Sequence, residues 1–88
     1  MRFVFDIETD GLIPELTKIH CIELIHVESG TAYSFTPDNV QAGLDMLEKA
    51  NEIIGHNIIG FDIPAIQKLK PDWKPQGKVT DTLVLSQL

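Results

Sequence analysis

Cysteines, basic side chains and long apolar runs are all scarce in this sequence of 88 residues. The single cysteine, Cys21, cannot form an intramolecular disulfide, and its strand-like neighbours predict a reduced, packed thiol. Seven Lys and Arg stand against thirteen Asp and Glu, which gives a formal net charge of −6. Such a chain repels nucleic acid non-specifically, so contact with a polyanion would need bound cations or a basic partner.

The lack of long apolar runs also bears on location. No run approaches the ~20 residues of a membrane-spanning helix, and acids follow Arg2 too soon for a signal peptide. We therefore expect no membrane partner and a cytoplasmic location. The length fits one small domain with a thin core, and 43% hydrophobic residues are ordinary for a globular chain.

Hydrophobic periodicity and turn residues divide the chain into strands and helices. Strands are predicted over 2–8, 19–27, 31–36 and 52–57, and helices over 39–50, 64–70 and from 81 onward, with a further strand before the last helix. Asp38 and Gln41 have the spacing of a capping box, and Trp73 in the loop over 71–78 is expected to cover the edge of the core. This order predicts an α/β fold with a mixed sheet, in which parallel strands extend an antiparallel three-strand meander and helices flank the sheet.

The first strand carries two acids in a segment that otherwise looks buried, "FVFDIET" over 3–9. Strand side chains alternate, so Phe3, Phe5 and Ile7 share one face while Asp6 and Glu8 share the other. Two neighbouring carboxylates repel each other, and burying either without a partner is costly. That face is therefore either wet or covered by something positive.

A third acid, Asp62, follows the strand that ends in "GHN". Alone, Asp62 is typical of a helix N-cap, and Asp6 with Glu8 is typical of a solvated sheet edge. Ligands gather at the carboxyl ends of parallel strands, where the predicted topology brings these two segments together. Three converging carboxylates without a Cys or His cluster favour Mg²⁺ or Mn²⁺ over Zn²⁺.

Two motifs here resemble those of a known family. "Asp6-Ile7-Glu8-Thr9" resembles the first motif of the proofreading 3′–5′ exonucleases, the four-carboxylate (DEDD) nucleases of the ribonuclease-H-like superfamily, and "Asn57-Ile58-Ile59-Gly60-Phe61-Asp62" resembles the second. With "TKIHC", "SGTAYSFTP" and "DTLVLSQL", nearly the whole chain is similar to the N-terminal exonuclease domain of family A DNA polymerases of small tailed phages. The resemblance implies a ribonuclease-H-like fold and removal of nucleotides from the 3′ ends of single-stranded DNA, in the host cytoplasm.

The same resemblance assigns roles to individual residues. It implies two metal ions, bridged by Asp6, with Glu8 on the ion that binds the attacking water and Asp62 reaching the other ion through water. Thr9 would contact the terminal nucleotide through its backbone, and Leu12 would pack on the terminal base. Asn57 and Phe61 would line the substrate groove.

Three of those substrate-binding residues have a plainer alternative. Leu12 and Phe61 are otherwise core residues, and Asn57 is otherwise a turn residue. His56 is interpreted as a hydrogen-bonded strand-end histidine. Asp81 resembles a family acid in an Asp-Thr pair, but a helix cap is the interpretation preferred for it.

The third motif of the family is missing from these 88 residues. No Tyr-x-x-x-Asp or His-x-x-x-x-Asp occurs, and Tyr33 has no Asp four positions later. The sequence also stops inside an apolar run, so we expect residues 1–88 to be the first half of such a domain, C-terminally truncated and poorly active alone. Apolar residues of the parallel edge, Val79, Leu83 and Leu85, would then lack cover and favour self-association.

Three hypotheses remain open at this stage. The chain is part of a metal-dependent exonuclease whose partner is the rest of a polymerase or exonuclease polypeptide. Alternatively, it is a nucleic-acid-binding or complementing half-domain without catalysis of its own, or a structural relic that folds but binds nothing specific.

Overall fold

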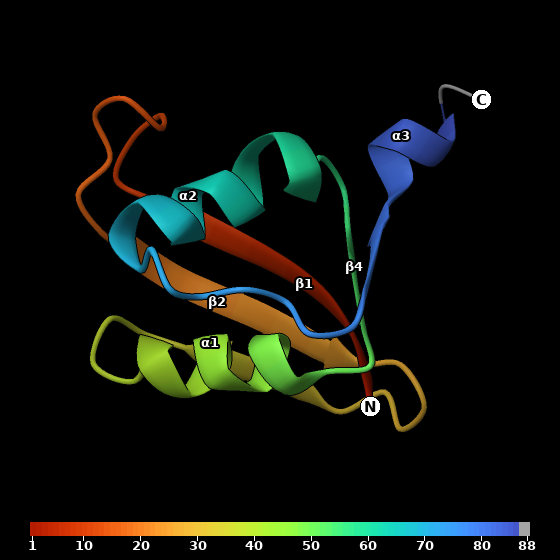
Figure 1. Ribbon diagram of the computed structural model, residues 1–88. Helices are drawn as coiled ribbons and strands as arrows, with labels where there is room; N and C mark the ends of the chain where they lie inside the picture. The colour runs from red at the N-terminus through yellow and green to blue at the C-terminus, as the bar shows by residue number, and fades with distance from the viewer. Residues whose placement is uncertain (87–88) are drawn as a thin grey trace.

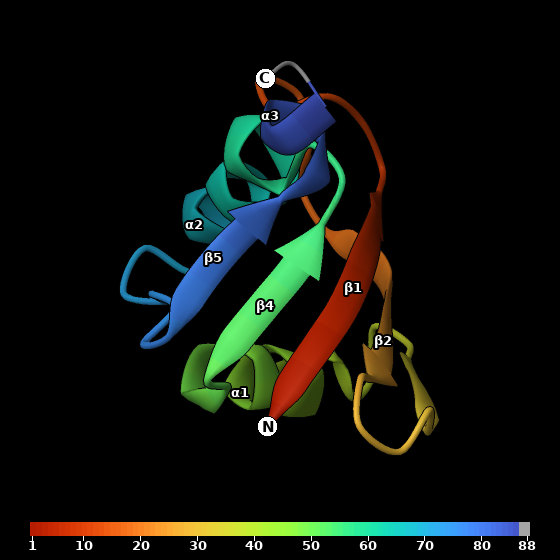
Figure 2. The same ribbon diagram turned by 90° about the vertical axis from the view of Figure 1, so that its right-hand side faces the viewer.

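The computed structural model describes residues 1–86, which form a sheet with helices packed on one of its faces (Figures 1 and 2). In chain order the elements are β1 (Arg2–Thr9), β2 (Ile19–His26), β3 (Ala32–Phe35), α1 (Val40–Lys49), β4 (Glu52–Gly55), the π-helical turn η1 (Ile58–Asp62), α2 (Ile63–Leu69), β5 (Lys78–Asp81) and α3 (Thr82–Ser86). The last two residues of the helix predicted from 81 onward lie outside the described residues. Within the described residues, no helix has both the length and the apolar character needed to cross a membrane.

The sheet is mixed, as the sequence predicts. Its five strands lie in the order β3-β2-β1-β4-β5. β1 pairs antiparallel with β2, which pairs antiparallel with β3, whereas β4 and β5 extend the sheet in parallel from β1. The carboxyl ends of β1, β4 and β5 therefore point to the same end of the sheet, where α3 begins (Figure 2).

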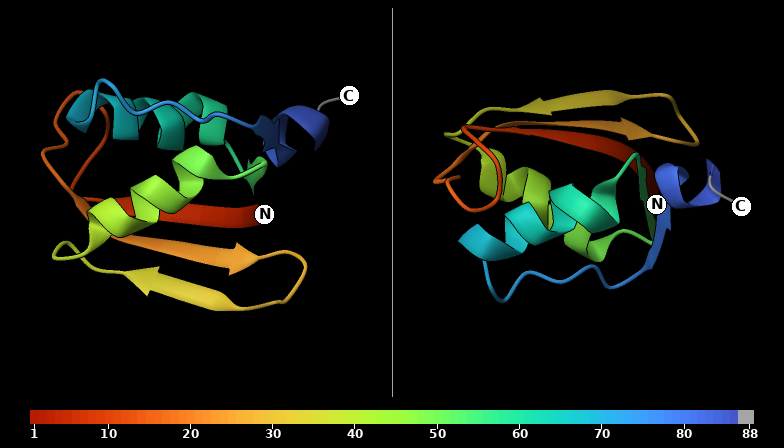
Figure 3. Two further views of the ribbon diagram at one scale, coloured as in Figure 1. Left: turned by 60° about the horizontal axis from the view of Figure 1, so that its bottom comes forward. Right: turned by 90° about the horizontal axis from the view of Figure 1, so that it is seen from above.

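The core lies between the sheet and the helices. Along β1 burial alternates strictly: Phe3, Phe5 and Ile7 are buried, and the residues between them are exposed. Figure 3 shows α1 and α2 on the same side of the strands. Trp73 closes this layer as predicted, because it is buried and its Nε1 donates to the Leu44 carbonyl of α1 at 2.9 Å.

Some local predictions are wrong, and a side-chain contact and a backbone conformation explain two of them. The capping box does not form: Asn39 precedes α1 without capping it, and its Oδ1 accepts instead from the Thr36 amide at 2.6 Å. The fourth strand ends at Gly55 rather than at 57, because Asn57 adopts a left-handed conformation with φ of 58°. Lys78, predicted in a loop, begins β5.

The apolar residues at the parallel edge have more cover than the sequence predicted. Val79 is partly buried against the core, and Leu83 is half-buried. Only Leu85 of the three is exposed, at 55%. The reason is that β5 pairs with β4 along its whole length, which places Val79 beside the buried Ile53.

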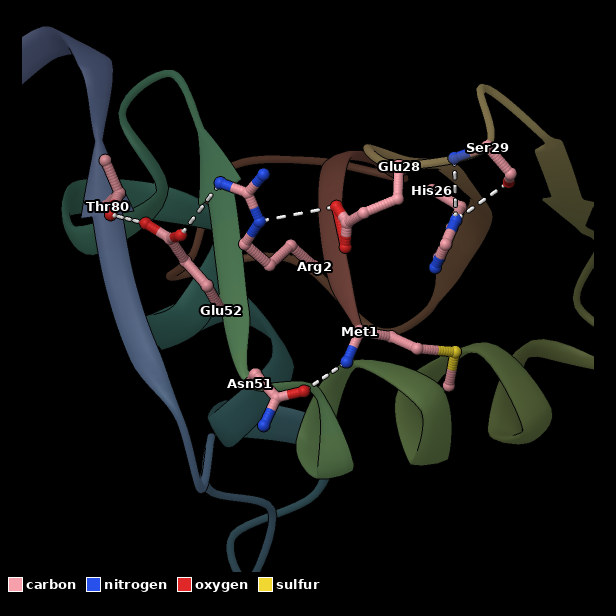
Figure 4. A network of polar contacts seen from close by, with 8 residues as sticks. All are labelled: Met1, Arg2, His26, Glu28, Ser29, Asn51, Glu52 and Thr80. Carbon is pink, nitrogen blue, oxygen red and sulfur yellow. Dashed lines mark hydrogen bonds and ion pairs between the residues drawn. The ribbon is translucent and has the colours of Figure 1, made fainter.

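A polar network ties the strands together at the opposite end of the sheet (Figure 4). Arg2 of β1 contacts Glu28 of the β2–β3 turn at 3.3 Å and Glu52 of β4 at 3.7 Å. Glu52 in turn accepts a hydrogen bond from Thr80 of β5. Since these ion pairs are partly exposed, each contributes little to stability.

Candidate functional site

The acids predicted on β1 lie on the sheet face that carries neither α1 nor α2. Asp6 and Glu8 are both exposed, because the buried Phe5 and Ile7 turn their own side chains toward the helices. At Asp6 and Glu8, this face of the sheet is therefore solvent-exposed in the described structure. Directly across the antiparallel pair, Glu23 of β2 stands opposite Asp6. Glu23 was not among the predicted site residues, because its place opposite Asp6 depends on the register of the β1–β2 pairing.

Asp62 reaches β1 from a segment far away in the sequence. It is only 4% exposed, and its Oδ2 accepts a hydrogen bond from the Ile7 amide at 3.3 Å. β1 pairs with β4 only as far as Val4, so beyond that point the carboxylate of Asp62 meets β1 where strand pairing has stopped. Asp62 does occupy the N-cap position of α2, as its alternative interpretation predicted, but its side chain makes no capping hydrogen bond there.

Burial and two neighbouring charges act on Asp62. Burial raises the pKa of this carboxyl to about 6, the Ile7 amide opposes that rise, and the charges of Asp6 and, to a smaller extent, Asp81 add to it. Asp6 and Asp62 are therefore close enough to repel each other. A cation placed between them would remove that repulsion.

The second motif is organised by its own backbone. Asn57, in its left-handed conformation, starts η1, and its carbonyl accepts from the Phe61 amide at 3.0 Å. Phe61 is partly buried against the core, as its plainer alternative predicted, while Asn57 is exposed. The turn interpretation of Asn57 is confirmed by this geometry, and both residues keep a solvent-accessible surface.

Thr9 and Leu12 lie at the carboxyl end of β1 and in the loop after it. The β1–β2 pairing becomes irregular between Glu8 and Thr9, and the Thr9 hydroxyl donates to the Gly11 carbonyl at 2.6 Å. Leu12 is 70% exposed, so its interpretation as a core residue is wrong. Asp10 holds the loop closed by accepting from the Thr17 amide at 2.8 Å.

Asp81 does more than the helix cap predicted for it. Its Oδ1 accepts from the Leu83 amide at 2.9 Å, which confirms the cap on α3. The same carboxylate also accepts from the amides of Asn57 and Ile59, each at 2.9 Å. Next to it, the Thr82 hydroxyl lies 3.0 Å from Nδ1 of His56, which is the hydrogen-bonded strand-end histidine expected.

The donor set suits a hard divalent cation in its chemistry, since it consists of carboxylate oxygens. Within residues 1–86, however, no three His, Cys, Asp or Glu side chains are grouped closely enough to form a ready-made metal site. The arrangement is a pair of exposed carboxylates on β1 beside a buried third one.

Two phage DNA polymerases are similar to this chain. The DNA-directed DNA polymerase of Enterobacteria phage T3 is 35% identical over 95 residues, and that of Escherichia phage T7 is 34% identical over 95 residues. Each alignment covers 97% of this chain but 14% of the polymerase. The chain is thus homologous to a segment of these polymerases.

The fold also recurs in a solved polymerase structure. The family B DNA polymerase from the hyperthermophilic archaeon Pyrobaculum calidifontis matches with a TM-score of 0.73 at 15% sequence identity, over 98% of this chain and 16% of that chain. At this identity the match shows the fold alone. No protein-family model matches the chain.

Proposed function

We propose that this homologue of a phage DNA polymerase segment is part of a 3′–5′ proofreading exonuclease domain, contributing Asp6, Glu8 and Asp62 to a site for Mg²⁺ or Mn²⁺. The observation that carries the proposal is the contact between Asp62 and Ile7, 55 positions apart in the sequence. It brings the acid of one motif against the strand that bears the two acids of the other. Neither a helix cap nor a solvated sheet edge requires that meeting.

The chemistry of the site follows from its charges. Bound divalent ions would lower the pKa of the attacking water and neutralise charge on the phosphodiester. Asp6 and Glu8 would hold the ions, since their side chains are exposed on one face. Asp62 is held by Ile7 and is nearly inaccessible, which suits a contact made through water rather than a direct bond.

The surrounding residues would bind the DNA 3′ end. Leu12, exposed in the loop after β1, offers an apolar surface on which the terminal base can pack. Thr9 places backbone groups at the end of the strand, and Asn57 with Phe61 lies at the neighbouring strand end. Two divalent ions would also change the formal charge from −6 toward −2, which eases the approach of a polyanion.

The proposed partner in catalysis is the rest of a polymerase polypeptide, acting in the cytoplasm of a host cell. The family's third motif would supply the fourth carboxylate and the group that orients water, and neither of its sequence patterns occurs here. We therefore expect the isolated chain to hydrolyse DNA very poorly.

A chimera tests this proposal directly. Residues 1–88 would replace the homologous segment of the phage T7 DNA polymerase, and degradation of single-stranded DNA from its 3′ end would be measured. We expect stepwise shortening that Asp6→Ala reduces by orders of magnitude and that Asp72→Asn, in an exposed loop, leaves unchanged.

The polymerase activity of the same chimera serves as the folding control. A chimera that extends primers but shows no Asp6-dependent degradation would contradict the exonuclease assignment. If the 88-residue chain alone binds single-stranded DNA and the chimera does not degrade that DNA, the exonuclease assignment is replaced by the alternative of a binding or complementing half-domain.

A further inference from the structure

The turn between β4 and η1 is held by two consecutive side chains at the start of α3. Asp81 accepts hydrogen bonds from the backbone amides of Asn57 and Ile59, both at 2.9 Å. Thr82 donates to the Gly55 carbonyl at 3.4 Å, and its hydroxyl also contacts His56. Asp81 and Thr82 thus hold the chain from Gly55 to Ile59, which covers the end of β4 and the start of the second motif.

Asp81 is an unusual group to find in this place. It is 4% exposed, and the backbone amides that it binds come from two separate segments. Burial opposes its ionisation, but those amides outweigh burial and lower the pKa of the carboxyl below its ordinary value. The ionised form of Asp81 is therefore favoured, and its carboxylate holds the backbone amides of Asn57, Ile59 and Leu83 in place.

We propose that Asp81, assisted by Thr82, is a positioning residue for the carboxylate site, because it fixes the backbone from which Asp62 extends toward β1. The inference rests on the proposed function and adds a residue that touches neither cation nor DNA.

A small displacement of the backbone at Asn57 is enough to disturb the contact between Asp62 and Ile7. Asn57 immediately precedes the π-helical turn that Asp62 ends, and the Phe61 amide donates back to the Asn57 carbonyl. A displacement of Asn57 is thus passed along the turn to Asp62. The Asp62–Ile7 contact is already long, at 3.3 Å, so a small further separation breaks it.

The substitution Asp81→Asn tests this geometry with little change of shape. The new amide keeps one acceptor oxygen, but its NH₂ group would face a backbone N–H, so at least one of the three bonds is lost. Asp72→Asn is the matched control, since it makes the same change of charge at an exposed loop position. Thr82→Val and Thr82→Ser form a second pair, in which only serine keeps the hydroxyl.

The experiment measures Mn²⁺ affinity by calorimetry on the full 88-residue chain, well below the melting temperature of every variant. A purely structural role would lower the melting temperature and leave this affinity unchanged. We expect Asp81→Asn to weaken Mn²⁺ binding by about 10-fold or more, as is typical for groups that orient metal ligands, and Asp72→Asn to leave it unchanged. Thr82→Val should weaken it less, and Thr82→Ser should restore it.

Hydrogen exchange of the Ile7 amide separates this inference from the proposed function. If the unmodified chain binds no Mn²⁺, the proposed function fails, and faster Ile7 exchange in Asp81→Asn than in Asp72→Asn still supports positioning of Asp62. Equal Ile7 exchange in these two variants would overturn the inference, and so would equal Mn²⁺ affinities if the unmodified chain binds Mn²⁺. Should Asp81→Asn fail to fold, the Thr82 pair decides by the same two readouts.

Discussion

At the scale of single residues, two buried carboxylates, Asp62 and Asp81, have opposite electrostatic surroundings. Burial raises the pKa of Asp62 beside an exposed acid, whereas backbone amides outweigh burial at the equally buried Asp81 and lower its pKa. Asp62 is the last residue of η1, whereas Asp81 accepts hydrogen bonds from amides at the start of the same turn. Under the proposed function, Asp62 belongs to the cation site, whereas Asp81 supports the backbone beside it.

The pH dependence of stability should reveal Asp62. Its folded pKa of about 6 lies above its ordinary value of 3.8, so the folded state binds more protons between these values. The free energy of unfolding contributed by this group therefore falls as the pH rises from about 4 through about 6. We compare the free energy of unfolding of Asp62→Asn with that of the unmodified chain. This difference should shift in favour of the variant by on the order of 1 kcal/mol as the pH rises from about 5 to about 7.5, measured by urea unfolding in chelator.

Asp10→Asn is the control for that measurement. Its hydrogen bonds from Thr17 lower the pKa of Asp10, so its contribution is complete above the unfolded value and constant across this window. A stability difference between Asp62→Asn and the unmodified chain that does not change with pH would contradict the assigned environment of Asp62.

Cys21 offers a reporter of charge on the exposed face of the sheet. Burial raises the pKa of its thiol, and Glu8, Glu23 and Asp6 raise it further. Mg²⁺ bound at the acids should lower that pKa and speed alkylation by iodoacetamide, because the thiolate is the reactive form. The single cysteine makes the rate unambiguous.

Glu8→Gln provides the comparison for the alkylation test. It should speed alkylation without Mg²⁺ and reduce the further effect of Mg²⁺. The same alkylation rate with and without Mg²⁺ in the unmodified chain would show that no cation binds near Cys21.

At the scale of elements, sequence patterns predicted what depends on local periodicity. The alternation in β1, the hairpin of β2 and β3, and the helices α1 and α2 follow from apolar spacing and were placed within one or two residues. The π-helical turn η1 was not predicted, because its shape depends on Asp81, which lies more than twenty positions away from Asn57 and Ile59. Likewise, the partner of Asp62 is a backbone amide, which no side-chain pattern can identify.

Gly55, at the end of β4, lies so close to β1 and to Ile58 that it leaves no room for a side chain. A Cβ there would lie 2.4 Å from Cγ2 of Ile58 and 2.9 Å from the Phe5 carbonyl oxygen, a backbone atom of β1. Gly55→Ala should therefore push β4 from β1 beside Asp6 and cost about 1–3 kcal/mol in urea unfolding. Gly11→Ala is the control, because its Cβ meets nothing closer than 3.8 Å. Equal stabilities of the two variants would show that β4 and β1 are not in close contact there.

At the scale of the whole molecule, the sheet face that carries neither α1 nor α2 has an apolar strip beside Asp6 and Glu8. Ile25 of β2 and Val4 of β1 stand opposite each other and are 47% and 41% exposed, and Ile54 of β4 follows Val4 across the sheet. We expect this strip to drive self-association, which a double variant Val4→Thr and Ile25→Thr should reduce in light scattering. Leu12→Thr, in the loop away from the strip, is the control. A monomeric unmodified chain at high concentration would contradict this expectation.

The thermal shift caused by Mn²⁺ tests the central claim, that the acids of β1 and Asp62 form a cation site. A ligand that binds only the folded chain raises its melting temperature. Millimolar Mn²⁺ should raise it by several degrees relative to chelator in the unmodified chain and in Asp72→Asn. Asp6→Asn should remove most of that shift, and Asp62→Asn should remove less. Equal shifts in the unmodified chain and in Asp6→Asn would show that these carboxylates are only a solvated sheet edge.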